Sequence, residues 1–101
     1  MPLVSTEWLN NNLNNVKIID CSWHMPNSKR DGHKEFLNGH IENAIFFDLE
    51  KHSNQQKNLP HNHFLPEKKD WEKELSKMGI SNNEKIVIYD NSDLITSCRC
   101  W

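Results

Sequence analysis

The sequence predicts an α/β fold in which helices pack on a parallel sheet. Three observations lead to this prediction: short apolar runs rich in β-branched residues, helical patterns between them, and an aspartate at the end of each apolar run. Strands that alternate with helices are typical of a parallel sheet with helical crossovers. Ligands bind such sheets beyond the carboxyl ends of the strands. Those ends are expected at Asp20-Cys21-Ser22, Asp48-Leu49 and Asp90-Asn91-Ser92.

The first helix and the first strand are expected over residues 6–15 and 16–21. Ser5 can cap the helix, and Glu7 lies in its first turn, where the helix dipole favours an anion. The face expected to be buried carries Trp8, Leu9 and Leu13. The strand is short and rich in β-branched residues, as strands usually are.

A loop, a short helix and a second strand are expected next. Residues 22–32 contain proline, asparagine and glycine, which favour a loop. Residues 33–38 predict a helix, and Gly39 is typical of the residue that ends one. The side chains expected on the inner face of this helix are Phe36 and Leu37. The apolar residues 44–47 predict the second strand.

The remaining chain predicts one more helix and strand. Residues 50–65 are dominated by polar side chains and are expected to be the least structured part. Residues 67–78 predict a helix with apolar side chains at i, i+4 and i+7, namely Trp71, Leu75 and Met78. Gly79 is expected to end that helix. Residues 86–89 form the clearest strand pattern, followed by a loop over 90–93 and the start of a helix over 94–101.

Composition excludes several classes of protein. The 101 residues fit at most one domain, and 36% of them are hydrophobic. The formal charge of −2, without a long basic run, argues against a nucleic-acid partner. No apolar segment approaches the ~20 residues that cross a bilayer, and the N-terminus lacks the features of a signal or transit peptide. We therefore expect no membrane partner and a cytoplasmic location. The three cysteines fit no disulfide framework.

Several segments, in order, resemble one family: the N-terminal rhodanese domain of two-domain thiosulfate and 3-mercaptopyruvate sulfurtransferases. The segments that carry the resemblance are Leu3 to Leu9, Ile19-Asp20-Cys21-Ser22-Trp23, Arg30-Asp31 to Phe36, Gly39-His40-Ile41 to Asp48, Met78 to Asn82, Val87-Ile88-Tyr89-Asp90, and Ser97, Arg99 and Trp101. One departure is Glu42-Asn43, where the family usually has Pro-Gly. Asparagine tolerates positive φ better than most residues, so we expect the tight turn to persist.

The resemblance implies a three-layer rhodanese-like domain over residues 1–101, incomplete at its C-terminus. It implies a contribution to a cleft for a small sulfur donor, with a C-terminal catalytic rhodanese domain as partner, and neither a cofactor nor a metal. In the family, the nucleophilic cysteine follows the strand that corresponds to residues 86–89. Asp90 stands at that position here. Because aspartate cannot form a persulfide, we expect no catalytic residue in this chain.

The resemblance also supplies candidates for the substrate cleft: Arg30, Asp31, His40 and Arg99. Structural roles are open to three of them. His40 can hydrogen-bond the backbone of the helix before it, Asp31 can cap a helix, and Arg30 can be a surface charge. Asp48 is expected to bind the backbone of a turn.

The cysteines and the histidine pair allow both structural and chemical roles. Cys98 is interpreted as an apolar residue on a helix face, and a reactive thiol is the second possibility. Cys98-x-Cys100 is half a metal site at most, because structural zinc needs about four ligands. Cys21 is interpreted as a small buried hydrophobic residue. His61-x-His63 lies in a polar segment and is expected to face solvent.

Two functions of different classes remain. The chain is either the N-terminal part of a sulfurtransferase, which works only with a catalytic partner domain, or a non-catalytic truncated fragment or binding module without activity of its own. A downstream reading frame that encodes a Cys-Gly-Ser-Gly-like loop would distinguish an enzyme from a fragment.

Overall fold

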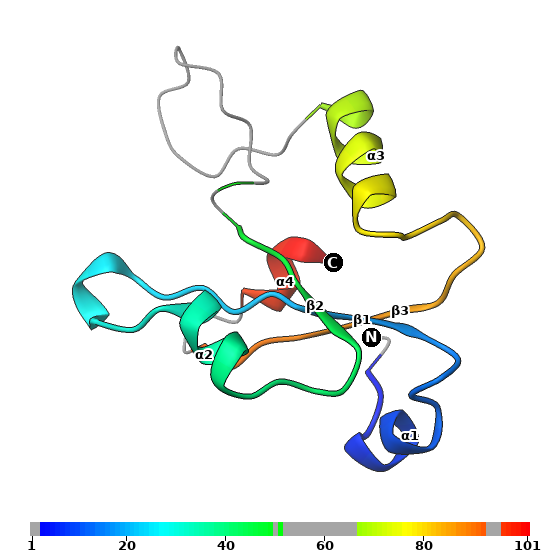
Figure 1. The fold of residues 1–101 in the computed structure, drawn as a ribbon, viewed down its shortest axis with the longest axis horizontal. Coiled ribbons are helices and arrows are strands. Elements are labelled where there is room, and N and C mark those ends of the chain that lie inside the picture. Colours follow the sequence, from blue (N-terminus) through cyan, green and yellow to red (C-terminus); the bar gives the residue numbers. More distant parts are fainter. Residues whose placement is uncertain (1–2, 50, 52–66, 93–95) are drawn as a thin grey trace.

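The computed structural model describes residues 3–49, 51, 67–92 and 96–101, without the side chains of Pro26 and Arg99. Helices and strands alternate along the chain, as the sequence predicts (Figure 1). The elements are α1 (Thr6–Asn11), β1 (Lys17–Asp20), the 3₁₀ turn η1 (Pro26–Ser28), α2 (Gly32–Asn38), β2 (Ala44–Phe46), α3 (Lys68–Lys77), β3 (Ile86–Tyr89) and α4 (Ser97–Cys100).

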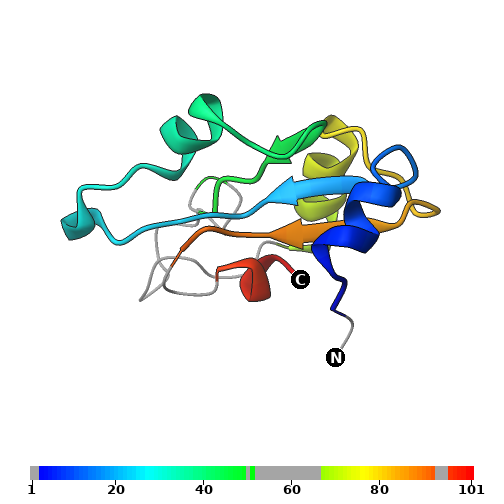
Figure 2. The same ribbon diagram turned by 90° about the horizontal axis from the view of Figure 1, so that it is seen from below.

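The described strands form one parallel sheet in the order β2-β1-β3. In this sheet β1 is central, with Ile19 beside Ile45 of β2 and Ile88 of β3. Figure 2 shows β1 and β3 side by side although they are far apart in the sequence. All three strands therefore end at the same edge, which confirms the parallel α/β class.

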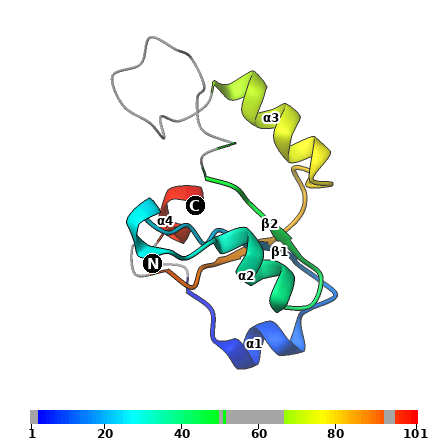
Figure 3. The same cartoon turned by 60° about the vertical axis from the view of Figure 1, so that its left-hand side comes forward.

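Helices lie on both faces of the sheet, which gives three layers. Figure 3 shows α1 and α2 on one side of the strands and α3 and α4 on the other. Residues in register along parallel strands point to the same face. The face toward α2 therefore carries Ile18, Asp20 and Tyr89, and the opposite face carries Ile19 and Cys21.

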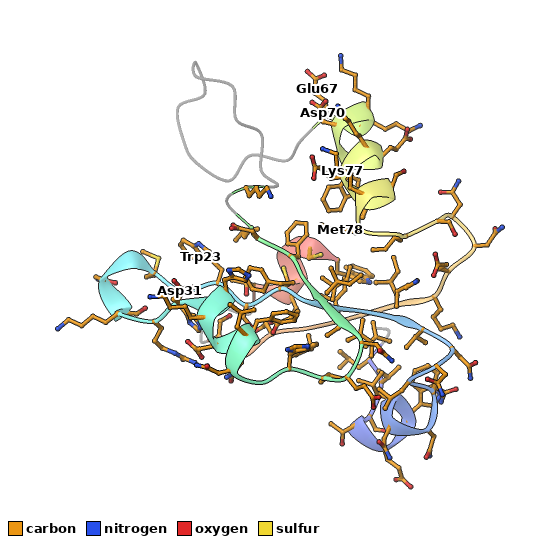
Figure 4. The ribbon with its side chains drawn as sticks, in the orientation of Figure 1. Trp23, Asp31, Glu67, Asp70, Lys77 and Met78 are labelled. Carbon is orange, nitrogen blue, oxygen red and sulfur yellow. The ribbon has the colours of Figure 1, made fainter. Side chains whose placement is uncertain are left out.

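The main core lies between the sheet and the layer of α3 and α4. Its buried members are Ile19, Cys21, Phe47, Leu49 and Ile80, and the half-buried side chains packed against them are Trp23, Trp71, Leu75, Met78, Ile88 and Cys100. The Phe47 and Trp71 rings meet edge to face with centroids 5.5 Å apart, an arrangement that aromatic pairs favour. In Figure 4, Glu67 and Asp70 lie at the outer end of α3 and Met78 at the end nearest the sheet.

Several local predictions are confirmed. The Ser5 hydroxyl accepts a hydrogen bond from the Trp8 N–H and caps α1. Asn43 has φ 67° and Gly79 has φ 79°, so both take the left-handed conformation that the turns require. Asp48 accepts a hydrogen bond from the Lys51 backbone N–H at 3.1 Å. The turn after His40-Ile41 thus persists without Pro-Gly.

The first helix is shorter than predicted and ends at Asn11 rather than residue 15. The Asn12 side chain donates to the Trp8 carbonyl at 2.8 Å, so it takes over an acceptor of the last turn. Asparagine competes with helical bonding in this way because its short amide reaches nearby backbone groups. The strand that follows covers residues 17–20 instead of 16–21.

The second helix also differs from its prediction. It begins at Gly32, and Leu37 is 66% exposed rather than facing inward. Of the two side chains expected to face inward, Phe36 points to the sheet, where its ring lies 5.6 Å from that of Phe46. Gly39 ends the helix with φ 179°, an extended conformation, so no left-handed residue is needed there.

The remaining boundaries need smaller corrections. The expected loop 22–32 contains η1, the second strand ends at Phe46, and the third helix covers 68–77. Cys98 is exposed, and Cys100 instead packs against the core, so the interpretation of Cys98 as the apolar face of α4 was wrong. The expectations for residues 52–65, including the histidine pair, lie outside the described residues.

Candidate functional site

A hollow of about 420 Å³ lies at the carboxyl ends of β1 and β3, under α2. It lies where the parallel-sheet rule places ligand sites. Its lining comes from segments that are distant in the sequence: Asp20, Ser22, Gly32, Glu35, Phe36, Gly39, His40, Ile41, Tyr89 and Asn91. Two of the three strand ends that the sequence indicated therefore meet in one site.

The Asp20 carboxylate is only 5% exposed and forms part of this lining. It accepts a hydrogen bond from the Ser22 N–H at 2.9 Å and one from the Tyr89 hydroxyl. The Tyr89 oxygen in turn accepts from the Ile41 N–H at 3.3 Å. Burial raises the pKa of Tyr89, and the Asp20 carboxylate adds to that increase. Tyr89 therefore stays a neutral donor at neutral pH, which keeps the buried carboxylate paired.

The side chains of Arg30 and Glu35 form a two-pronged ion pair at the rim. The Arg30 Nη2 and Nε atoms lie 2.7 and 3.2 Å from the Glu35 carboxylate oxygens. Arg30 also donates to the Asn91 carbonyl at 3.4 Å, which links the loop before α2 to the end of β3. The hydrogen bond from Arg30 holds the pKa of Glu35 below its usual value. An anionic ligand at this rim would meet a guanidinium already paired with a carboxylate.

His24 approaches the same ion pair from the buried side. Its side chain is 5% exposed, and Nε2 lies 3.4 Å from a Glu35 oxygen. This nitrogen makes no hydrogen bond of acceptable geometry. Glu35 therefore lies between the Arg30 guanidinium and the His24 imidazole.

His40 lines the hollow and is fixed to the end of α2. Nδ1 lies 2.7 Å from the Phe36 carbonyl, and because a carbonyl only accepts, Nδ1 carries a proton. The imidazole stacks on the Phe36 ring with centroids 3.9 Å apart. The structural role that the sequence allowed for His40 is thus present.

Two cleft candidates remain. Asp31 lies outside the lining of the hollow, and the side chain of Arg99 is not among the described parts of the structure. Asp31 caps α2 by accepting from the Lys34 N–H at 3.1 Å, and Figure 4 shows it at the start of that helix. The backbone of Arg99 belongs to α4, but its side chain is outside the described part. The structure thus brings His40 and Arg30 to the same site and assigns Asp31 a helix cap.

Asp90 follows β3 and holds the loop before α4 through its carboxylate. One oxygen accepts from the Ser92 N–H and hydroxyl, both at 3.0 Å, and the other accepts from the Ser97 N–H at 2.9 Å. Partial burial would raise the pKa of Asp90, but the hydrogen bonds from Ser97 and Ser92 outweigh it and lower the pKa. An anion therefore occupies the end of β3, surrounded by backbone and hydroxyl donors.

The sequence profile of the rhodanese-like domain family matches residues 5–101, nearly the whole chain. The chain belongs to the rhodanese-like domain family. This confirms the family resemblance and places the domain among the relatives of sulfurtransferases.

Individual relatives of this rhodanese-like domain agree with that assignment. It is 37% identical to mitochondrial thiosulfate/3-mercaptopyruvate sulfurtransferase 1 of Arabidopsis thaliana, over 99% of the chain and 26% of that protein. It is 31% identical to 3-mercaptopyruvate sulfurtransferase of Escherichia coli K12, over 97% of the chain and 35% of that protein. The crystal structure of SseA from Escherichia coli superposes with a TM-score of 0.85 at 30% identity, covering 98% of this chain and 38% of that one.

The rhodanese-like domain thus spans between about a quarter and two fifths of the length of these relatives. In the part of the chain that the structure describes, no helix is both long and apolar enough to cross a membrane. Within the same residues, no three His, Cys, Asp or Glu side chains come together as a metal site would require.

Three polar residues of the rhodanese-like site escaped the sequence analysis: His24, Glu35 and Tyr89. The sequence pattern places Glu35 on an exposed face of the helix. Its contact with Arg30 depends on the conformation of the loop before α2. The position of Tyr89 at the end of a strand was a usable signal, since strand ends were expected to form the site. No local signal identifies His24, because its neighbour Glu35 belongs to a different element.

Removing the Asp90 carboxylate is expected to destabilise the rhodanese-like domain. In Asp90→Ala the Ser92 and Ser97 N–H groups lose their acceptor, so we expect the free energy of unfolding to fall by about 1–3 kcal/mol at pH 7. Because the folded pKa is lowered, this contribution is present above the unfolded pKa of about 3.9 and is lost as pH falls through the folded value. The difference between wild type and variant should therefore shrink below about pH 4.

Urea unfolding at pH 7 and at pH 3 measures both parts of this prediction. Asp70→Ala is the matched control, because Asp70 is an exposed aspartate on α3, and we expect it to change stability by less than about 1 kcal/mol. Equal destabilisation of Asp90→Ala at both pH values would show that the carboxylate charge plays no part.

Proposed function

We propose that this domain is the non-catalytic N-terminal half of a thiosulfate or 3-mercaptopyruvate sulfurtransferase, whose nucleophilic thiol comes from a second rhodanese domain. The observation that carries the proposal is Asp90 at the end of β3, with its carboxylate enclosed by three hydrogen bonds. The names of the relatives supply the two candidate donors.

Sulfur transfer needs a thiolate that attacks the outer sulfur of the donor and holds it as a persulfide. Backbone N–H groups in a loop before a helix favour such an anion. Here the corresponding loop binds the Asp90 carboxylate, which has no sulfur atom and so cannot hold a persulfide. The cysteines lie elsewhere: Cys21 is buried at the end of β1, and the remaining two are in α4.

The contribution of this half is a polar wall for the cleft. The Asp20 carboxylate accepts a hydrogen bond from the Ser22 N–H, and the charge of Glu35 is offset by Arg30. His40 lines the hollow, and the Arg30 guanidinium, paired with Glu35, lies at its rim. Further positive charge for the donor would come from the partner domain and from Arg99. The preference for thiosulfate or 3-mercaptopyruvate would then depend on residues of both domains.

A sulfurtransferase assay tests the absence of the thiol. We expect the purified chain, given thiosulfate or 3-mercaptopyruvate with cyanide, to produce thiocyanate at the rate of buffer alone. A catalytically active sulfurtransferase in parallel shows that the assay works. Thiocyanate produced by the chain and lost in Cys98→Ser would overturn the proposal, since the chain would then carry its own nucleophile.

Ligand titration tests the wall of the cleft. Added thiosulfate is expected to shift the amide NMR signals of Gly39, Ile41 and Asn91, which line the hollow. The amides of Lys73 and Ser76 on α3 serve as internal controls, because they lie on the opposite side of the sheet. Signal shifts confined to α3, or no shifts at millimolar thiosulfate, would contradict a role of the hollow in binding the donor.

A further inference from the structure

Two of the cysteines meet inside the fold although they are far apart in the sequence. Cys21, at the end of β1, is fully buried, and Cys100 is in α4. Cys21 belongs to the hydrophobic cluster between the sheet and α4, and Cys100 packs against that cluster. Cys98 is only two residues away from Cys100 but is exposed on the outside of the helix. One pair of thiols is therefore selected by the fold and the third is left out.

Thr96 holds α4 in position relative to Cys21. Its hydroxyl donates to the Cys21 carbonyl at 2.6 Å, and its own carbonyl lies 3.5 Å from the Cys21 sulfur. Thr96 is buried and immediately precedes α4. The approach of Cys100 to Cys21 is thus supported by two further contacts to the same residue.

We propose that Cys21 and Cys100 form a reversible disulfide within the chain when it meets hydrogen peroxide. In the first step the Cys100 thiolate attacks one peroxide oxygen. The O–O bond breaks, a sulfenic acid forms on Cys100, and the departing oxygen leaves as water after taking up a proton. In the second step the Cys21 sulfur attacks the Cys100 sulfur, the Cys21 proton is lost, and the sulfenic oxygen leaves as a second water. Two thiols are oxidised and one peroxide is reduced.

Accessibility assigns the first step to Cys100. Its side chain is only half-buried, whereas that of Cys21 has no exposed surface. The neighbouring Cys21 thiol lowers the pKa of Cys100, against the effect of burial, whereas the neighbouring Cys100 thiol and burial raise the pKa of Cys21. The thiolate reacts and the thiol does not, so Cys100 is the attacking group and Cys21 is the resolving one.

The disulfide would fix α4 to the central strand. Ser97, the first residue of α4, donates to Asp90 at the end of β3. Oxidation therefore tightens the loop after β3 at the same edge of the sheet as the hollow. This inference does not depend on the proposed sulfurtransferase role, because it requires only the two thiols and an oxidant.

Treating the 101-residue chain with hydrogen peroxide under native conditions tests the proposal. We expect titratable thiols to fall from three to one, the mass to fall by two hydrogen atoms, and peptide mapping to join Cys21 to Cys100. Closing so long a loop should raise the thermal midpoint by about 10–20 °C. Dithiothreitol should reverse all of these changes.

Single variants separate the two thiols from the third. Cys98→Ser is the matched control and should form the same bond to the same extent. Cys100→Ser should lose both the bond and the rise in thermal midpoint, and it leaves the fully buried Cys21 in place. A bond that includes Cys98, a dimer linked between chains, or Cys100 oxidised to sulfinic acid while Cys21 stays reduced would each overturn the proposal.

Discussion

Replacing Ile18 by alanine is expected to lower the free energy of unfolding by about 3 kcal/mol. Ile18 is 0% exposed and lies on central strand β1, between Ala44 and Val87 of the neighbouring strands. Truncation removes buried methyl groups and leaves a cavity that two hydrogen-bonded neighbours prevent from closing. Against a total stability of roughly 5–15 kcal/mol, such a loss is a large fraction.

Chemical unfolding followed by tryptophan fluorescence measures the effect. The matched control is Ile86→Ala, the same substitution on β3 at a side chain that is 38% exposed, and we expect it to cost less than about 1.5 kcal/mol. If the two variants were equally stable, β1 would not be the centre of the sheet.

Alanine at position 32 is expected to destabilise the domain by about 1–3 kcal/mol. A Cβ atom there would lie 2.6 Å from the Ser22 carbonyl oxygen and 3.2 Å from its carbon. Both are backbone atoms, so no side chain can rotate away. The start of α2 would have to move from the end of β1, and both residues line the hollow.

Gly39→Ala provides the comparison at the opposite end of the same helix. A Cβ atom there meets nothing within 4 Å, and φ is 179°, which any residue adopts. We expect no loss of stability and a slight gain, since alanine restricts the unfolded chain more than glycine. Thermal unfolding of both variants measures the difference. Equal midpoints would mean that α2 can shift freely over Ser22.

The sequence predicted those parts of the fold that depend on neighbouring residues. The strand at 86–89 was placed correctly because β-branched residues are concentrated there. The cap at Ser5 and the left-handed Asn43 follow from side-chain chemistry and backbone sterics within one turn. A hollow lies at the strand ends that the sequence indicated, because the carboxyl ends of parallel strands meet at one edge of the sheet.

Features that depend on contacts between distant segments were not predicted. The exposure of Leu37 contradicts a local pattern that does not reveal how little of α2 the sheet covers. The hydrogen bond from Arg30 to the Asn91 carbonyl forms only because the loop before α2 lies beside the end of β3. The pairing of Cys21 with Cys100 instead of a role for Cys98 depends on where α4 rests. Sequence spacing alone fixes none of these distances.

The order of the strands has a consequence for synthesis of the chain. Strand β1 needs both β2 and β3 beside it, and β3 ends at Tyr89. Residues 1–89 must therefore leave the ribosome before the middle of the sheet is complete. Until then Ile18 and Ile19 are exposed to other proteins in the cell. The nascent chain should therefore need a chaperone for longer than one whose adjacent strands are also consecutive.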